Sequence, residues 1–220
     1  MTDDMASPNA EPVLLEETSG GVRILTLNRP AKKNALSGDL VQALVQGFEA
    51  AAADDAVRVI GLTGAGEAFC SGADLAGPKP AADGTPGRAR MDDQVVRLVT
   101  GIRVDCEKPV IAGIGGIAIG AGLSLALCAD MRIASSKARF HPGYARAGSS
   151  PDCGLSWTLP QAIGHERAMR FLLDLEMLDA DAAFASSISC SSKKRIARSG
   201  PTARGSVQES PQSGDVPARA

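Results

Sequence analysis

Short runs of branched apolar residues alternate with helical patterns along most of this chain, and several of the runs end in glycine-rich turns. Two such runs, at residues 57–62 and 109–114, predict buried strands. After Ser37, a candidate N-cap, apolar residues recur at helical spacing from Leu40 onward. Strands that alternate with helices predict right-handed βαβ crossovers, and therefore an α/β fold.

The rest of the chain divides into one central domain, at 12–183, and two polar ends. Residues 1–11 are acidic and polar, and residues 184–220 are rich in Ser, Arg, Gly and Pro, so neither end can bury enough apolar surface to order itself. Both are predicted to be disordered. Residues 76–90, rich in Gly, Pro and Ala, predict a mobile surface loop. Further signals predict strands at 13–15, 22–27 and 131–134, a turn at 19–21, and helices at 91–102 and from Gly120.

Composition excludes several classes of function. The net charge of -2 offers no basic field for nucleic acid, and no apolar run reaches the ~18 residues of a membrane span. The N-terminus lacks the pattern of a signal peptide. Five scattered cysteines and two histidines fit neither a disulfide framework nor a metal site. We therefore expect a cytoplasmic protein with reduced thiols and no bound metal.

Two glycine- and alanine-rich segments follow predicted strands, at 64–75 and 115–130. Ligands of open α/β sheets bind beyond such strand ends, and the free N–H groups at a helix N-terminus suit an oxyanion. The alternative for each segment is close packing, because Gly and Ala let backbones approach. Neither segment matches a dinucleotide or P-loop phosphate motif.

Taken in order and spacing, six motifs from about residue 13 to residue 183 resemble the enoyl-CoA hydratase/isomerase (crotonase) superfamily. The resemblance implies a crotonase-like (ClpP/crotonase) stacked ββα superhelix that assembles as a homotrimer or hexamer, here with its C-terminal helical part missing or replaced by the biased tail. The motifs are LNRPAKKNAL at 27–36, AFCSGADL at 68–75, GAG at 120–122, CADMRIA at 128–134, PDCG at 151–154 and LPQAIG at 159–164 followed by Arg167-Ala168.

The resemblance also implies a chemistry, the stabilised enolate of an acyl-CoA thioester. The two oxyanion N–H groups would belong to Ala73 and Ala121. Coenzyme A would enter as part of the substrate, with no separate cofactor. For Lys33 a solvated surface lysine is the alternative. Residues implied to line the CoA and substrate groove are Lys33, Ala35, Leu36, Ser71, Gly72, Asp74, Leu75, Gly120 and Tyr144.

The reaction is predicted from three positions. The two glutamates of a family hydratase would align with Ser124 and Tyr144, and neither side chain can act as carboxylate base or acid near neutral pH. Ser124 is then a helix-packing residue, and Tyr144 either lines the acyl pocket or packs. Asp152 matches the acid position of several family isomerases, although capping of the helix predicted near Gly154 is the alternative role for this side chain.

The sequence therefore favours double-bond isomerisation over hydration. Migration of a double bond needs one base, and a lone carboxylate in an apolar pocket suits that task. Cys153 has no histidine nearby in sequence and makes a weak candidate nucleophile. The alternatives left open are a catalytically impaired crotonase-fold remnant that only binds acyl-CoA, and a hydratase or lyase relative.

Overall fold

The computed structural model describes residues 11–74, 76, 87–145 and 148–185, without the side chains of 87–92 and 184–185. Most of the two ends predicted to be disordered, and most of the predicted mobile loop, lie outside the described residues. Regular structure within the described part continues to Ala185, two residues beyond the predicted domain boundary.

The chain begins with an antiparallel hairpin of β1 (Leu14–Ser19) and β2 (Val22–Leu27). Its two-residue turn has both glycines at positive φ, 57° at Gly20 and 81° at Gly21. Such a turn follows the natural twist of the paired strands, and few side chains tolerate it.

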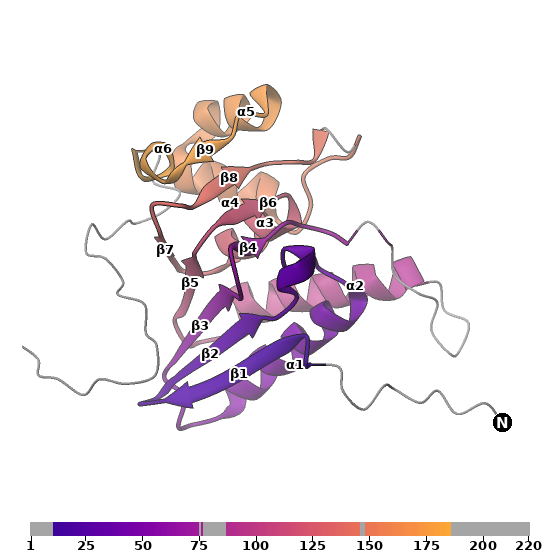
Figure 1. The fold of residues 1–220 in the computed structure, drawn as a ribbon, viewed down its shortest axis with the longest axis vertical. Helices are drawn as coiled ribbons and strands as arrows, with labels where there is room; N and C mark the ends of the chain where they lie inside the picture. Colours follow the sequence, from indigo (N-terminus) through magenta and orange to yellow (C-terminus); the bar gives the residue numbers. More distant parts are fainter. Residues whose placement is uncertain (1–10, 75, 77–86, 146–147, 186–220) are drawn as a thin grey trace, which may run out of the picture.

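A five-stranded sheet extends this hairpin in the order β1-β2-β3-β5-β7. Its other members are β3 (Val59–Gly64), β5 (Val110–Ile114) and β7 (Met131–Ala134), and every neighbouring pair from β2 onward is parallel. The strands predicted from apolar runs all lie in this sheet, as Figure 1 shows.

A second sheet, in the order β4-β6-β8-β9, is built from strands of two or three residues. It comprises β4 (Ala68–Cys70), β6 (Ile117–Ile119), β8 (Arg139–His141) and the antiparallel β9 (Leu178–Asp179). Each of β3, β5 and β7 is followed directly by a strand of the second sheet and then by a helix. This succession of ββα turns is the predicted architecture.

Helices close each of these turns. They are α1 (Gly38–Ala53), α2 (Gly87–Thr100) with a π-helical turn (Gly101–Asp105), α3 (Ala121–Cys128), α4 (Leu155–Ile163), α5 (His165–Asp174) and α6 (Ala180–Ala185); a 3-10 turn, Pro30–Lys32, precedes α1. The predicted N-cap is confirmed, because Ser37 Oγ accepts a hydrogen bond from the Leu40 N–H at 3.3 Å. In Figure 1, α5 and α6 lie at the end of the molecule opposite α1.

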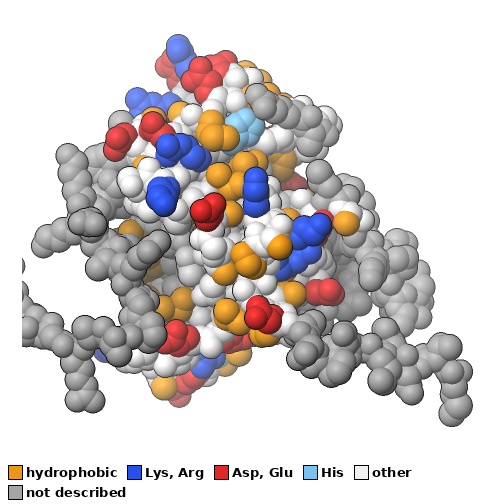
Figure 2. All heavy atoms as spheres, in the orientation of Figure 1, with side chains coloured by type: hydrophobic (Ala, Val, Ile, Leu, Met, Phe, Trp, Pro, Cys, Tyr) orange, Lys and Arg blue, Asp and Glu red, His pale blue; other side chains and the backbone are white. Residues whose placement is uncertain are grey.

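The face of the molecule in Figure 2 carries no single-sign field. Lys and Arg side chains alternate with Asp and Glu, and hydrophobic side chains are scattered among them. Within the described part of the chain, no helix is long and apolar enough to cross a bilayer.

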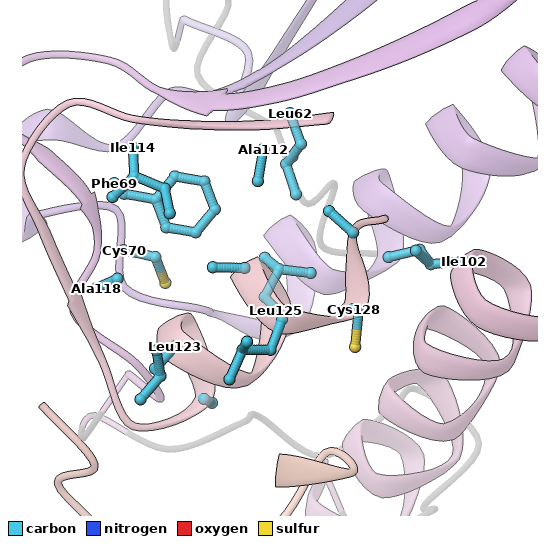
Figure 3. Packing of buried hydrophobic residues seen from close by; sticks show 14 of the residues in the cluster. Leu62, Phe69, Cys70, Ile102, Ala112, Ile114, Ala118, Leu123, Leu125 and Cys128 are labelled. Atoms are coloured by element: carbon cyan, nitrogen blue, oxygen red, sulfur yellow. The ribbon is translucent and has the colours of Figure 1, made fainter. Parts of the chain in front are cut away.

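The core lies between the sheets and the helices, and α3 runs through it. All eight residues of α3 are buried, so this helix has no polar face. Figure 3 shows Leu123 and Leu125 of α3 among side chains from β3, β4 and β5, including Leu62, Phe69 and Ile114. The N-terminus of α3 is therefore fixed from several sides.

Some predicted boundaries are wrong. α2 begins at Gly87, so residues 87–90 are helical rather than part of a loop. The sequence analysis also missed β4, β6, β8 and β9, as well as α5 and α6. The three-residue strands are too short to show alternation, and pairing with distant partners stabilises them instead.

Candidate functional site

The two glycine- and alanine-rich segments meet because β4 pairs with β6 in parallel. A Cβ atom added at Gly122 would lie 2.3 Å from the Cys70 carbonyl oxygen, so α3 packs directly on the end of β4. A Cβ atom added at Gly72 would lie 2.9 Å from the Ile119 carbonyl oxygen and 3.5 Å from the Ala121 nitrogen. The segment after β4 and the segment after β6 are thus in contact at the N-terminus of α3.

Each of the two predicted donors follows a glycine in an unusual conformation. Gly72, before Ala73, has a φ of 98°, and Gly120, before Ala121, has φ 54° and ψ -123°. These values lie where L side chains are strained, so both positions require glycine. The two glycines set the orientation of the peptide planes that carry the Ala73 and Ala121 N–H groups.

The Ala73 and Ala121 N–H groups donate no backbone hydrogen bond among the described residues. Ala73 lies opposite Leu36 in a parallel β-bridge, but the hydrogen bonds of this bridge use the residues on either side of Ala73. The Leu36 N–H donates to the Gly72 carbonyl at 2.8 Å, and the Asp74 N–H donates to the Leu36 carbonyl at 3.1 Å. Ala121 is the first residue of α3, where N–H groups have no partner within the helix. Among the described residues, no acceptor faces either N–H group.

Asn34 holds the loop that leads into this bridge. It is fully buried with a φ of 56°, a conformation that Asn tolerates better than most residues. Its Oδ1 accepts from the Arg29 N–H at 2.9 Å, and its Nδ2 donates to the carbonyls of Ala65 and Ala68 at 2.9 and 2.8 Å. The sequence analysis missed this residue, whose clue was an Asn in a turn rich in Pro and Lys.

Arg29 and Asp74 form an ion pair beside the same loop. The two side chains are each 19% exposed, and Arg29 Nη2 lies 2.8 Å from Asp74 Oδ2. Arg29 also donates to the Ala35 carbonyl. A hydrogen bond from the Ala76 N–H, followed by the one from Arg29, lowers the pKa of Asp74 below its ordinary value. The carboxylate of Asp74 therefore helps to hold the loop.

The remaining predicted groove residues gather around this loop. Lys33 is exposed with a φ of 49°, and its carbonyl accepts from the Ser71 N–H at 3.0 Å. Both interpretations of the Lys33 side chain, a ligand contact and a solvated surface lysine, are compatible with this exposed position. Of the others, Ala35, Leu36, Gly72 and Gly120 are buried, Ser71 is half-buried, and Leu75 lies outside the described residues.

The three positions that decide the reaction lie in one hydrogen-bonded cluster. The hydroxyl of Tyr144, in the turn after β8, lies 2.8 Å from Ser124 Oγ on α3 and donates to Asp152 Oδ1 at 2.5 Å. Tyr144 and Ser124 are buried. The cluster sits one helical turn from Gly120, because the Ser124 N–H donates to the Gly120 carbonyl at 3.0 Å. Ser124 therefore does more than pack.

The capping alternative for Asp152 is wrong. The N-cap of α4 is Gly154, and no side chain caps this helix. The Leu155 N–H bonds the Asp152 carbonyl at 2.9 Å instead of its carboxylate. Cys153 and Gly154 both have positive φ, 49° and 78°, so the backbone reverses directly after Asp152 and its side chain reaches Tyr144 rather than the helix end.

The predicted apolar pocket around Asp152 is also absent from the described part of the chain. Asp152 is exposed, although its Oδ1 contacts the buried Tyr144 hydroxyl. Asp152 contacts Tyr144 in the turn after β8 and Ser124 of α3. Burial raises the pKa of Tyr144, and the hydrogen bond to Asp152 raises it further.

The cysteines near the site are poor nucleophiles. Burial raises the pKa of the Cys70 thiol to about 12, and burial followed by its contact with Asp152 also raises the pKa of Cys153. A thiolate, rather than a thiol, attacks, so these side chains stay unreactive near neutral pH. Among the described residues, no group of three or more His, Cys, Asp or Glu side chains could hold a metal ion.

A family model described as enoyl-CoA hydratase/isomerase matches residues 17–186, which include every part of this site. The chain belongs to the enoyl-CoA hydratase/isomerase family. Its succession of ββα turns is the architecture expected of this family. The matched range also includes the strands and helices that the sequence analysis missed.

Curated relatives of this chain have names that refer to reactions of CoA thioesters. A probable enoyl-CoA hydratase of Mycobacterium leprae is 41% identical over 167 residues, which are 73% of this chain and 56% of the relative. The 1,2-epoxyphenylacetyl-CoA isomerase of Escherichia coli is 36% identical over 177 residues, covering 77% of this chain and 65% of that enzyme. The chain thus spans less than two thirds of these relatives.

A solved crotonase-fold structure agrees with the same assignment. The crystal structure of a probable enoyl-CoA hydratase/isomerase from Mycobacterium abscessus has a TM-score of 0.75 and 33% sequence identity. The alignment covers 82% of this chain and 69% of that protein. Fold and sequence therefore place the chain in one family.

Proposed function

We propose that this chain moves a double bond within an enoyl-CoA thioester. Asp152 is the base, and the N–H groups of Ala73 and Ala121 are the donors that stabilise the enolate oxygen. The observation on which this depends most is the hydrogen bond from Tyr144 to Asp152 Oδ1, at 2.5 Å. It presents one carboxylate beside Ser124 of α3, where a hydratase of this family would have two.

The chemistry needs one base and one oxyanion site. In a 3-enoyl thioester, Asp152 takes a proton from C2, and the C–H electrons form a C1–C2 double bond while the carbonyl becomes an oxyanion. The two N–H groups donate to that oxygen. The same carboxyl group then returns the proton to C4, which leaves the double bond between C2 and C3 and restores the carbonyl. No other reactant is required.

The oxyanion donors supply most of the stabilisation in such a reaction. Removal of one preorganised donor typically costs about 3–4 kcal/mol in the transition state. Both N–H groups belong to the backbone, and rigid elements hold them, because α3 is buried and the bridge between Leu36 and Ala73 fixes the other segment. Alanine at position 121 carries the same backbone N–H that a glycine would carry there. Its methyl group therefore leaves the donor intact.

Coenzyme A would lie along the loop that Asn34 and Arg29 hold, against Lys33, Ala35 and Leu36. The exposed Lys33 supports contact with a phosphate of the nucleotide. Because CoA arrives as part of the substrate, we expect no separate cofactor. A homotrimeric or hexameric assembly and a cytoplasmic location remain proposals, the second supported by the four unpaired cysteines among the described residues.

Hydratase or lyase chemistry is the second candidate. The names of the relatives favour it, since the Mycobacterium leprae protein is called a probable enoyl-CoA hydratase. The residues oppose it, because Ser124 and the high-pKa Tyr144 cannot share the tasks of base and acid on one water. The relatives described above carry enzyme names, so the comparisons give no support to a catalytically impaired remnant.

Incubation of the full chain with a 3-enoyl-CoA and, separately, with a 2-enoyl-CoA tests the proposal. We expect conversion of the first to a 2-enoyl-CoA, and no 3-hydroxyacyl-CoA from the second. Asp152→Asn should lower the rate of conversion by ~10²–10⁴-fold, whereas Asp55→Asn, which changes an exposed carboxylate on another surface, should leave it unchanged. Equal rates for wild type and Asp152→Asn would exclude Asp152 as the base.

A further inference from the structure

The Tyr144 hydroxyl links a buried serine to an exposed carboxylate. Tyr144 is 7% exposed, and its oxygen lies 2.8 Å from Ser124 Oγ and 2.5 Å from Asp152 Oδ1. These are short distances for oxygen pairs, and the one to the carboxylate is in the range of charge-assisted hydrogen bonds. The side chain expected to pack or to line an acyl pocket therefore has a defined polar role.

The proton positions in this chain of contacts follow from the chemistry of the groups. An ionised carboxylate can only accept, so Tyr144 donates its O–H in a hydrogen bond to Asp152. The phenol oxygen then accepts a hydrogen bond from Ser124, whose hydroxyl also lies 3.3 Å from the carbonyls of Gly120 and Asp152. The contact with Tyr144 is the shortest of the three. The hydrogen bonds thus run in one direction, from Ser124 through Tyr144 to Oδ1.

This direction leaves the second oxygen of the carboxylate for chemistry. With Oδ1 held by Tyr144, Oδ2 is the oxygen that can exchange a proton with a substrate. Asp152 stands on an exposed turn, and without a partner its carboxylate could adopt several rotamers. The hydrogen bond from Tyr144, with the Cys153 thiol against the same carboxyl group, selects the orientation.

The same contacts tie the base to the oxyanion site. Ser124 lies one turn after Ala121 on α3 and is linked to the Asp152 carboxylate through the Tyr144 hydroxyl. The distance between the enolate donor and the proton acceptor is therefore set through one buried helix. A displacement of about 1 Å between reacting groups can cost ~10²-fold in rate, so such a tie has a measurable effect.

We propose that Tyr144, supported by Ser124, is a positioning residue that fixes the Asp152 carboxylate relative to the donor at Ala121 and leaves Oδ2 to carry the proton. This inference rests on the proposed function, in which Asp152 is the base. Tyr144 touches no reacting atom and acts only through Asp152.

Steady-state kinetics of Tyr144→Phe on a 3-enoyl-CoA test the inference. This variant keeps the buried ring and removes only the hydroxyl. We expect kcat to fall by about 10²-fold with KM within about twofold of wild type, and Ser124→Ala to lower kcat by ~2–10-fold through the lost donor to Tyr144. Thr63→Val is the matched control, because it removes a half-buried hydroxyl that donates to the Gly113 carbonyl in the large sheet, and its kinetics should match wild type.

The double variant separates a positioning role from a structural one. If Tyr144 acts through Asp152, then Asp152→Asn with Tyr144→Phe should be no slower than Asp152→Asn alone. A wild-type kcat in Tyr144→Phe, a proportional rise in KM, or a further loss in the double variant would overturn the role of Tyr144 while leaving Asp152 as the base. No conversion by wild type, or full activity of Asp152→Asn, would overturn the proposed function together with this inference.

Discussion

Gly72 and Gly120 occupy equivalent places in the two segments of the site. Both have positive φ, and each directly precedes a residue whose N–H group donates no backbone hydrogen bond to a described residue. They come from the ends of two parallel strands, β4 and β6. The orientation of the Ala73 and Ala121 N–H groups, the proposed oxyanion donors, therefore depends on two backbone conformations rather than on any side chain.

Gly72→Ala should lower both stability and activity. A Cβ atom there would combine a strained φ of 98° with a distance of 2.9 Å to the Ile119 carbonyl oxygen, so the peptide that carries the Ala73 N–H must move. Gly20→Ala is the control, with a φ of 57° and no atom within 4 Å of the added Cβ. We expect Gly20→Ala to cost about 1–2 kcal/mol of unfolding free energy. Gly72→Ala should cost more than that and should also lower kcat/KM. Equal urea midpoints for the two variants would contradict this expectation.

Gly122→Ala should separate α3 from β4. The added Cβ would lie 2.3 Å from the Cys70 carbonyl oxygen, and backbone cannot yield as a flexible side chain does. We expect a loss of at least 1–3 kcal/mol, as in overpacked cores. Gly115→Ala, with nothing within 4 Å of its Cβ, should stay within about 0.5 kcal/mol of wild type. Urea unfolding followed by circular dichroism measures both, and similar midpoints would show that the contact is not tight.

The large sheet could be predicted from sequence because its strands carry their own signal. β3, β5 and β7 are apolar runs bounded by turns, and α1 shows both its cap and its apolar spacing. The second sheet gave no such signal. Strands such as β6 have three residues, and their stability comes from partners that are distant in sequence. Likewise α2 begins four residues earlier than predicted, where the Gly and Pro content indicated a loop.

The site was predictable where it depends on backbone motifs and less so where it depends on side-chain direction. The contact between the segments that carry Ala73 and Ala121 could be expected from motif resemblance, whereas the role of these residues as donors stays a prediction. The orientation of Asp152 did not, because the positive φ of Cys153 turns its side chain away from α4, and a cysteine gives no hint of that conformation. The role of Asn34 depends on the carbonyls of a segment that follows the next strand, so no local pattern indicates it.

Asp74→Asn should destabilise the fold in a pH-dependent way. The folded-state pKa of Asp74 is lowered, first by the Ala76 N–H and then by Arg29, so its contribution is present above the ordinary value of 3.8 and is lost as the pH falls through the lower folded-state pKa. We expect a loss of about 1–2 kcal/mol near neutral pH, and convergence with wild type in acid. Glu49→Gln breaks the Arg97 pair, in which both side chains are more than half exposed, and should change stability by less than about 1 kcal/mol. A difference for Asp74→Asn that persists in acid would exclude the ion pair as its cause.

Tyr144 is the sole tyrosine of the chain, so tyrosinate absorbance reports this residue alone. Burial, followed by the hydrogen bond to Asp152, raises its pKa, whereas in the unfolded chain it should titrate near ~10. The neutral phenol therefore contributes stability that is fully present below the unfolded value and is lost as the pH rises toward the folded one.

We expect no absorbance change in the folded protein at the pH where the urea-unfolded chain ionises, and a cooperative rise only when alkali unfolds it. Asp152→Asn removes the neighbouring charge and should bring ionisation to a lower pH than in wild type, still above that of the unfolded chain, because burial remains. Ser124→Ala removes a donor that favours the phenolate, and should move ionisation in the opposite direction. Titration of folded wild type at the unfolded value would mean that the Tyr144 hydroxyl is solvated and that its bond to Asp152 does not form.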